Sequence, residues 1–244
     1  MCGRIVQPRS LAELAELFEA FTDADAELAR PSFNVAPTDL VPGILLDAAG
    51  RRRVRALRWG LEPAWLANGD RAAAATRRVS AGNPSPLINA RAETVEENGL
   101  FRGAFRARRC IIPADAFYEW RRGEPRLEPH LVKRLDGEPL ALGGLFEPGY
   151  HGSDGVSLSC AIVTTRPNQL VAALHDRMPL ILPRTAWNAW LDPATEPPAL
   201  RPLLQPLASS DLERYPVSSR VNNVRADGPE LIQRAEEPLT LGLA

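Results

Sequence analysis

Cys2 is one of three cysteines in this 244-residue chain, and it directly follows the first methionine. Removal of Met1 would leave Cys2 with an α-amine and a thiol on adjacent carbons. An α-amine has a pKa of about 8, so much of it is neutral at neutral pH. A neutral amine attacks an aldehyde or ketone to form an imine, and the neighbouring thiol can then close a five-membered ring. Position alone leaves two alternatives open, which are attack on an acyl carbon and no chemical role.

Two other segments contain residues suited to proton transfer. Glu119 lies between Tyr118 and Trp120, and a carboxyl group between aromatic rings is often desolvated, which raises its pKa. His175 is expected at a helix end, where the helix dipole favours its charged form. We consider both as acid–base candidates. The alternatives are a solvated carboxylate on an edge strand and a structural histidine.

Asn89 and Arg91 are two positions apart in the segment INARAET. On a strand they would share one face, which would direct an amide and a guanidinium into the same cleft. From these residues alone, a strand end where Asn89 satisfies backbone groups is the favoured interpretation. The two remaining histidines, His130 and His151, are expected at the start of a strand and in an exposed turn.

The other two cysteines, Cys110 and Cys160, lie in apolar, strand-like runs. This setting is typical of small buried thiols. Three cysteines cannot all pair, and no CxxC spacing suggests zinc. We therefore expect no metal, no cofactor, and free thiols in a reducing cytoplasm.

The charge balance excludes a polycationic protein, because 29 basic residues face 30 acidic ones. Basic residues do cluster at 51–58 and 101–110. Arginine suits phosphate recognition, although such runs are more often solvated faces. No apolar run approaches the roughly 20 residues of a membrane helix. Acidic residues interrupt the first 20 positions, where a secretion signal would need an apolar stretch. We therefore expect a cytoplasmic protein that does not bind membranes.

The elements that must position these residues are short. The segment SLAELAELFEAF predicts an amphipathic helix, with Ser10 and Glu13 forming a capping box. The expected apolar face of this helix consists of Leu14, Leu17, Phe18 and Phe21. Two apolar runs around a turn at 47–50 then predict a hairpin.

Short β-rich runs separated by turns continue along the chain at 110–120, 130–135, 140–148 and 158–165. Residues 166–175 predict a short helix. The pattern predicts an α+β fold, with a largely antiparallel, barrel-like sheet and flanking helices in one domain over residues 1–244. Residues 66–86 are small, polar and proline-containing, which predicts a variable surface insert.

A series of short motifs runs along nearly the whole chain. In order, they are MCGRI, FNVAPT, LRWGLEPAW, INARAET, RRCIIPADAFYEW, LGGLFEP, AIVTTRPN, LHDRMPLIL and PVSSRVNN. Together they resemble the SRAP family, the SOS-response-associated peptidase proteins, and the set is far more specific than any single motif. Ala116 and Phe146 depart from residues common in the family, glycine and tryptophan, and neither is a presumed catalytic position.

The resemblance implies a role in the DNA-damage and SOS response. Family members recognise abasic sites in single-stranded DNA and shield them through a thiazolidine crosslink with Cys2. An open abasic sugar is an aldehyde, so it matches the aminothiol chemistry. The family is also thought to remove its own Met1, hence the name peptidase, and lyase activity is a further expectation. We expect a monomer that joins the nucleoid when bound to DNA.

The family pattern assigns four catalytic residues. Cys2 is the nucleophile, Asn89 positions the N-terminus or the sugar, Glu119 shuttles protons, and His175 helps to open the sugar. Arginines would contact phosphates, Pro37 and Trp120 would wedge against or stack on bases, and two tryptophans would shape the groove. The expected DNA-binding residues are Arg4, Pro37, Trp59, Trp65, Arg91, Trp120 and Arg177.

Two other hypotheses remain. One is a cysteine hydrolase or autoprotease, in which Cys2 attacks an acyl carbon and His175 acts as the base. It predicts peptide release in trans and no reaction with abasic DNA. The other is a non-covalent module for single-stranded DNA, in which arginines and aromatic rings provide all the binding. It predicts that a Cys2→Ala substitution leaves DNA binding unchanged.

Overall fold

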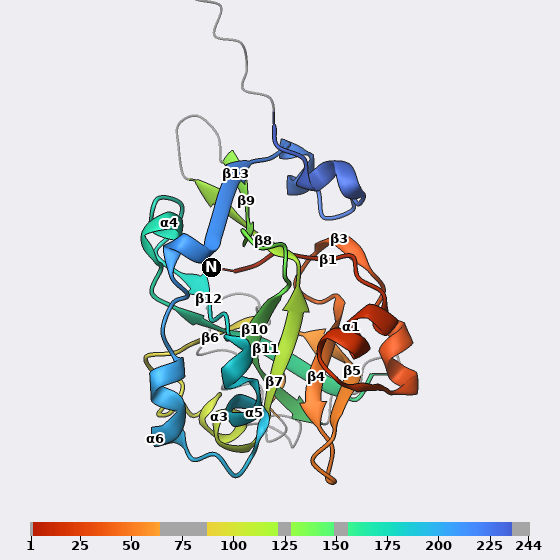
Figure 1. Ribbon diagram of the computed structural model, residues 1–244, viewed down its shortest axis with the longest axis vertical. Helices are drawn as coiled ribbons and strands as arrows, with labels where there is room; N and C mark the ends of the chain where they lie inside the picture. The colour runs from red at the N-terminus through yellow and green to blue at the C-terminus, as the bar shows by residue number, and fades with distance from the viewer. Residues whose placement is uncertain (1, 64–86, 122–127, 149–155, 236–244) are drawn as a thin grey trace, which may run out of the picture.

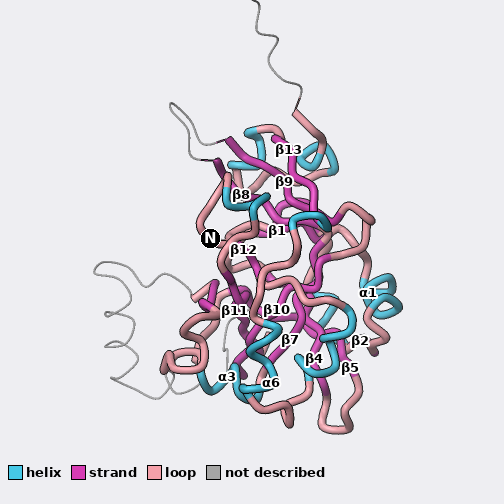
Figure 2. Tube along the Cα trace, turned by 60° about the vertical axis from the view of Figure 1, so that its left-hand side comes forward, coloured by secondary structure: helices cyan, strands magenta, loops and turns pink. Residues whose placement is uncertain are grey.

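The computed structural model describes residues 2–63, 87–121, 128–148 and 156–235 (Figure 1). Two sheets dominate it. In Figures 1 and 2, the sheet that contains β13, β9 and β8 lies at one end of the molecule, and the sheet that contains β10, β7 and β4 lies toward the other. Trp65 and the predicted insert at 66–86 lie outside the described residues.

The larger sheet closes into a barrel. Its strands run in the order β11 (Leu158–Thr165), β10 (Leu140–Pro148), β7 (Arg109–Ala114), β4 (Leu40–Leu46) and β5 (Arg52–Trp59), each antiparallel to the next. Strand β5 then pairs in parallel with β11, which closes the circle. Three short strands extend the barrel: β2 (Phe21–Thr22), β6 (Asn89–Arg91) and β12 (Met178–Pro179).

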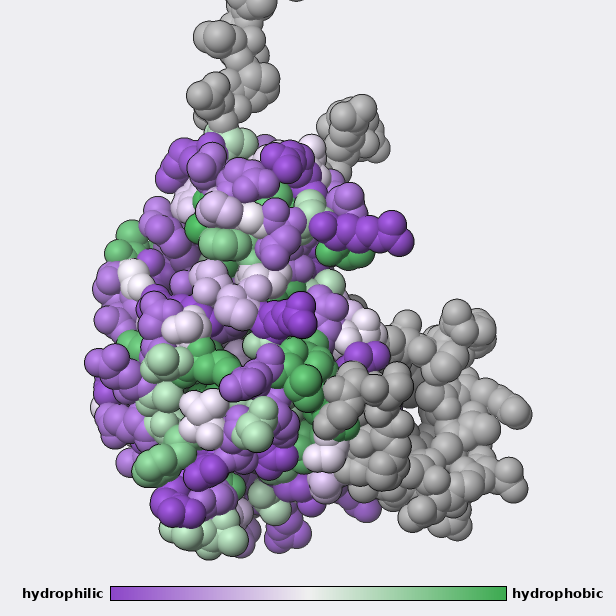
Figure 3. Space-filling view, turned by 90° about the vertical axis from the view of Figure 1, so that its right-hand side faces the viewer, coloured by the Kyte–Doolittle hydropathy of each residue, from purple (hydrophilic) through white to green (hydrophobic). Residues whose placement is uncertain are grey.

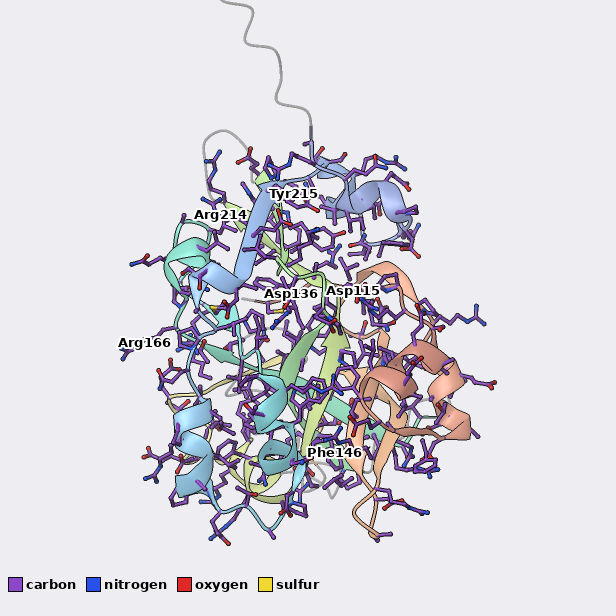
Figure 4. The ribbon with its side chains drawn as sticks, in the orientation of Figure 1. Asp115, Asp136, Phe146, Arg166, Arg214 and Tyr215 are labelled. Atoms are coloured by element: carbon purple, nitrogen blue, oxygen red, sulfur yellow. The ribbon has the colours of Figure 1, made fainter. Side chains whose placement is uncertain are left out.

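The smaller sheet is antiparallel throughout. Its order is β13 (Leu212–Pro216), β9 (Glu128–Arg134), β8 (Ala116–Arg121), β1 (Ile5–Gln7) and β3 (Ser32–Val35). Strand β1 places the start of the chain beside β8, with Ile5 opposite Phe117. The run predicted over 110–120 is therefore two strands, because the chain passes from one sheet to the other at Asp115 (Figure 4). The Asp115 carboxylate accepts a 2.6 Å hydrogen bond from Arg9.

The first helix confirms the predicted cap. Helix α1 (Leu11–Leu17) begins after Ser10, and the Ser10 and Glu13 side chains form the reciprocal capping box. Leu14 and Phe18 are buried as predicted. The helix ends before Phe21, which lies in β2 with 58% of its surface exposed, so its assignment to the helix face was wrong.

The remaining helices are short. They are α3 (Arg102–Ala107), α4 (Gln169–Ala172), α5 (Trp187–Leu191), α6 (Pro197–Leu200), and the 3₁₀ turns η1 (Ala24–Leu28), η3 (Arg184–Ala186), η4 (Arg201–Leu203), η5 (Ser209–Asp211), η6 (Ser219–Asn222) and η7 (Pro229–Ile232). No helix in the described ranges is long and apolar enough to cross a membrane. On the face of the molecule seen in Figure 3, hydrophilic side chains surround small, scattered apolar patches.

These elements confirm the predicted α+β class and the largely antiparallel, barrel-like sheet. The hairpin around residues 47–50 is also confirmed, with Leu46 opposite Arg52 and a positive φ of 74° at Gly50. Cys110 and Cys160 lie in the barrel core and are fully buried, as predicted. A single domain spanning residues 1–244 stays a prediction.

Candidate active site

Cys2 belongs to the same apolar cluster as the barrel cysteines, and its residue is fully buried. Backbone pairing holds this end of the chain, because the Tyr118 N–H donates to the Arg4 carbonyl at 3.0 Å. Burial raises the pKa of the Cys2 thiol, and the negative charge of Glu119 raises it further. The sulfur is therefore held as a thiol at neutral pH.

Asn89 begins β6 and hydrogen-bonds directly to Cys2. Its Nδ2 donates to the Cys2 carbonyl at 2.9 Å. Its Oδ1 is buried and has no hydrogen-bond partner among the described residues. Strand β6 pairs in parallel with β11, with Asn89 opposite Ile162, which fixes the amide. A buried, unpaired acceptor is costly, so this oxygen is suited to receive a donor that arrives with the reaction.

Glu119 lies in β8 with only 4% of its surface exposed. Burial raises the pKa of its carboxyl, and a positive charge on His175 opposes that rise. The Trp120 backbone N–H donates to Glu119 Oε1 at 3.2 Å. A carboxyl with a raised pKa can donate a proton and then take one back at neutral pH, which is what an acid–base group needs.

His175 follows α4, and its ring is held through Nδ1. The Arg177 backbone N–H donates to this nitrogen at 3.0 Å, while Asp176 Oδ1 lies 2.7 Å from the same atom. The two contacts are alternatives, because a nitrogen that accepts from Arg177 carries no proton to donate to Asp176. In the neutral ring the Arg177 contact places the proton on Nε2. Protonation of Nδ1 would exchange that contact for the Asp176 carboxylate.

The structure therefore brings the four predicted catalytic residues together from separate parts of the chain. A hydrogen bond joins Asn89 to Cys2, and Glu119 acts electrostatically on both Cys2 and His175. Among the described residues, no group of three or more His, Cys, Asp or Glu side chains is placed to hold a metal ion.

Arg4 and Trp120 both contact turn η6 in the C-terminal part of the chain. Arg4 is only 8% exposed, and one of its terminal nitrogens donates to Asn34 Oδ1 at 2.6 Å and to the Val221 carbonyl at 2.8 Å. Its guanidinium lies 5.8 Å from the Trp120 ring centre. Trp120 Nε1 donates to Asn222 Oδ1 at 2.7 Å. Arg4 thus orients the predicted stacking residue, and its own phosphate contact stays a prediction.

Arg177 is already bound within the protein. Its two terminal nitrogens donate to the Glu93 carboxylate at 2.7 and 2.8 Å, and one of them also donates to the Thr164 carbonyl. Arg91, on β6, is exposed. Of the two arginines predicted to hold flanking phosphates, Arg91 is thus the accessible one, while Arg177 would have to share its guanidinium with Glu93.

Pro37 occupies a tight turn. The Asp39 N–H donates to the Ala36 carbonyl at 3.1 Å, and Thr38 has a φ of 77°. Proline followed by a positive φ defines a type II turn, and a β-branched residue is strained there. The turn is held to β5 because the Thr38 N–H donates to the Trp59 carbonyl at 2.8 Å.

Trp59 is fully buried, so in this arrangement its ring faces no solvent groove. Its Nε1 donates to the Ile88 carbonyl at 3.0 Å, and the Ile162 N–H donates to the same carbonyl at 3.0 Å. Trp59 therefore shapes the site indirectly, by holding the residue that precedes Asn89.

Sequence reasoning missed Glu93, Thr164 and Asn222, which hold predicted DNA-binding side chains. Glu93 lies inside the quoted INARAET motif, two positions after Arg91, so its charge could have suggested a partner for an arginine. Thr164 and Asn222 gave no such signal, because hydrogen bonds between distant segments leave no local pattern.

The family model described as SOS response associated peptidase (SRAP) matches residues 1–224, and the chain belongs to this family. It is 37% identical over 235 residues to the abasic site processing protein YoqW of Bacillus subtilis, covering 96% of this chain and 99% of that one. It is 30% identical over 241 residues to the abasic site processing protein HMCES of Xenopus tropicalis, covering 85% and 67%.

The fold has a solved counterpart. A crystal structure of a protein from Bacteroides thetaiotaomicron matches with a TM-score of 0.79 over 96% of this chain and 100% of that chain. At 22% sequence identity this match shows a common fold.

Proposed function

We propose that this protein recognises abasic sites in single-stranded DNA and, after loss of Met1, joins them covalently to Cys2 as a thiazolidine that shields the lesion. YoqW and HMCES are both named as abasic site processing proteins, and both relatives align over most of this chain. The observation that carries the proposal is the hydrogen bond from the Asn89 amide to the Cys2 carbonyl, beside the buried carboxyl of Glu119, which raises the pKa of the Cys2 thiol.

That protonated thiol favours the amine as the first nucleophile. A cysteine that attacks acyl groups needs a thiolate, and its pKa is usually lowered by a nearby positive charge. Here burial and the Glu119 charge raise the pKa of the Cys2 thiol. These conditions support imine formation by the α-amine followed by thiol addition, and they disfavour the hydrolase alternative.

The proposed reaction balances without a cofactor. The Cys2 amine forms a bond to the aldehyde carbon as the C=O π bond breaks, and one amine proton moves to the oxygen, which becomes a hydroxyl. Protonated Glu119 gives a proton to that hydroxyl, which leaves as water, so an iminium ion forms. The sulfur then bonds to the same carbon, the iminium electrons return to nitrogen, and the thiol proton returns to Glu119.

Two further groups serve the same sequence. Asn89 Oδ1 accepts a hydrogen bond from the amine while Nδ2 holds the Cys2 carbonyl, so the amide orients the nucleophile. His175 moves a proton at the sugar ring oxygen and opens the sugar to its aldehyde. Arg91 and Arg177 hold flanking phosphates, and Pro37 and Trp120 contact the neighbouring bases. The protein acts as a monomer in the cytoplasm, and Met1 is removed by the protein itself or by a host aminopeptidase.

The test is adduct formation on a denaturing gel with a single-stranded oligonucleotide that carries one abasic site. We expect a heat-stable adduct with wild-type protein and with the matched control Cys160→Ala. Cys2→Ser should form only a labile imine, because a hydroxyl does not close a stable thiazolidine. A normal heat-stable adduct from Cys2→Ala would refute the proposed chemistry.

A further inference from the structure

We propose that His130 passes a proton between Glu119 and the protein surface during ring formation. This inference rests on the proposed function. His130 lies in β9, only 5% of its surface is exposed, and nothing in the reaction described above uses it. It acts through Glu119 and therefore positions and relays a proton without touching the DNA.

The strand register places His130 beside Glu119. The two residues are directly opposite in the antiparallel pair of β8 and β9. Such opposite residues have side chains on the same face of the sheet, with Cβ atoms about 5 Å apart. Phe117 and Val132 form the equivalent pair two positions away and belong to the apolar cluster that contains Cys2. The face shared by Glu119 and His130 is therefore the one that faces Cys2.

The His130 ring contacts Glu128, a side chain that is partly exposed to solvent. His130 Nε2 lies 3.1 Å from Glu128 Oε2, and Glu128 also forms an ion pair with Arg121. The Glu128 side chain is 41% exposed. His130 Nδ1 is buried and has no hydrogen-bond partner among the described residues. With the proton of the neutral ring on Nε2 and directed at Glu128, Nδ1 carries an unpaired lone pair, which is too far from Glu119 for a direct hydrogen bond and can be reached from it through one bridging water.

Burial and two nearby arginines keep the His130 ring neutral at neutral pH. Burial lowers the pKa of His130, and the positive charges of Arg214 and Arg121 lower it further. The Glu128 carboxylate acts in the opposite direction and raises it. Arg214 lies on the neighbouring strand β13 (Figure 4). Turn η6 also packs against β9, and its Arg220 is paired with Glu230. A neutral imidazole beside an acid of raised pKa can accept its proton.

The reaction requires such an exit when the Cys2 amine begins as an ammonium. Amine, thiol and aldehyde combine to give thiazolidine and water with no net proton change. An ammonium brings one additional proton, which must leave before nitrogen can attack the carbonyl carbon. Protonated Glu119 first passes its own proton through a bridging water to His130 Nδ1, and Nε2 releases its proton to Glu128 and solvent. Glu119 then takes the ammonium proton from nitrogen and is again the protonated acid that dehydration needs. No bond other than these N–H and O–H bonds changes in the relay.

The experiment measures single-turnover adduct rates between pH 5 and 9 for wild type, His130→Gln and the control Lys133→Gln. Lys133 lies on the same strand, where it is opposite Ala116. We expect His130→Gln to slow the reaction about tenfold at pH 7.5, since positioned proton-transfer groups contribute at least this much. The ratio of wild-type to variant rates should fall toward one below the His130 pKa, because a protonated ring cannot accept a proton.

A second variant, Glu128→Gln, tests the relay if His130→Gln folds poorly. Loss of the carboxylate should lower the pKa of His130, so the inflection in the rate profile should move to lower pH. A rate ratio independent of pH, or an inflection that Glu128→Gln does not move, would overturn the relay. If wild type formed no adduct at any pH, the proposed function would fail instead.

Discussion

The barrel strands that carry Cys110 and Cys160, and the site around Cys2 beside β8, present the same side chain in two environments. Cys110, Cys160 and Cys2 are all fully buried, and burial raises the pKa of each thiol. Among the described residues, Cys2 alone of the three has a side-chain amide bound to its carbonyl and a carboxylate that raises the pKa of its thiol. Burial therefore does not distinguish the proposed nucleophile, Cys2, from the other two cysteines. The polar side chains beside Cys2 distinguish it.

Among the groups around Cys2, Glu119 is expected to have the largest effect on the rate of adduct formation when it is changed to Gln. The substitution keeps the shape of the side chain and removes its acid–base function, so adduct formation should slow about 100-fold or more. Single-turnover rates with abasic single-stranded DNA measure this effect. An adduct rate close to that of wild type would show that Glu119 is not the proton donor.

The same variant, Glu119→Gln, also tests whether the pKa of the Glu119 carboxyl is raised, through the pH dependence of the free energy of unfolding. The folded-state pKa of Glu119 is raised, so the folded state binds more protons than the unfolded state between the two pKa values. Stability from this group is thus present at low pH and lost as pH rises through that window. Denaturant unfolding should show Glu119→Gln gaining stability relative to wild type as pH increases from about 4 to 7. A stability difference that is constant with pH would contradict the raised pKa.

In the barrel interior, the matching change is Gly144→Ala. A Cβ there would lie 2.8 Å from Cys110 Sγ and 3.1 Å from an Ile112 side-chain carbon, so the core must shift. We expect a loss of about 1–3 kcal/mol in unfolding free energy, measured by denaturant unfolding. Adduct formation by the folded fraction should be unchanged. A selective loss of adduct without destabilisation would show that the two regions are coupled.

Two arginines extend the comparison to DNA binding. Arg91→Gln should weaken binding to single-stranded DNA and make the slope of log affinity against log salt shallower by about 0.7. Arg53→Gln is the matched control, because Arg53, on β5, forms an ion pair with Asp23. Fluorescence anisotropy over a salt series gives both slopes. Equal slopes for Arg91→Gln and wild type would remove Arg91 from the phosphate contacts.

The smallest effect is expected at the ion pair behind the site. Arg177 lowers the pKa of Glu93 through the hydrogen bonds between them. This stabilisation is present above the unfolded-state pKa of a glutamate and is lost as pH falls through the lower folded-state value. Because Glu93 is partly exposed, Glu93→Gln should cost at most about 1 kcal/mol. Thermal unfolding at pH 7 and pH 3 should show a smaller cost at pH 3 than at pH 7.

The local features of the fold could be predicted from the sequence. The capping box of α1 and the β4–β5 hairpin follow from residues within a few positions of one another. The division of 110–120 into two strands could not be predicted, since Asp115 marks a change of sheet inside a continuous β-rich run. That change depends on which distant strands are available for pairing.

The candidate site shows the same difference between local features, which the sequence predicted, and contacts between distant segments, which it did not. The family motifs located Cys2, Asn89, Glu119 and His175, and local aromatic neighbours pointed to a desolvated Glu119. The surroundings of Arg4 and Arg177 needed the tertiary structure, because their partners Val221 and Glu93 lie 217 and 84 positions away. The sequence assigned His130 only to a strand, and its place opposite Glu119 depends on the register of β8 and β9.

Intact mass spectrometry of the protein after incubation with abasic single-stranded DNA tests the central claim most directly. Lys133 is the only lysine in the chain, so Lys133→Arg protein carries no competing side-chain amine of that type. The account predicts one product with the mass of the protein without Met1 plus the oligonucleotide minus one water, with fragmentation placing the link at Cys2. A protein that keeps Met1 and still forms the adduct, or a link at any other residue, would contradict it.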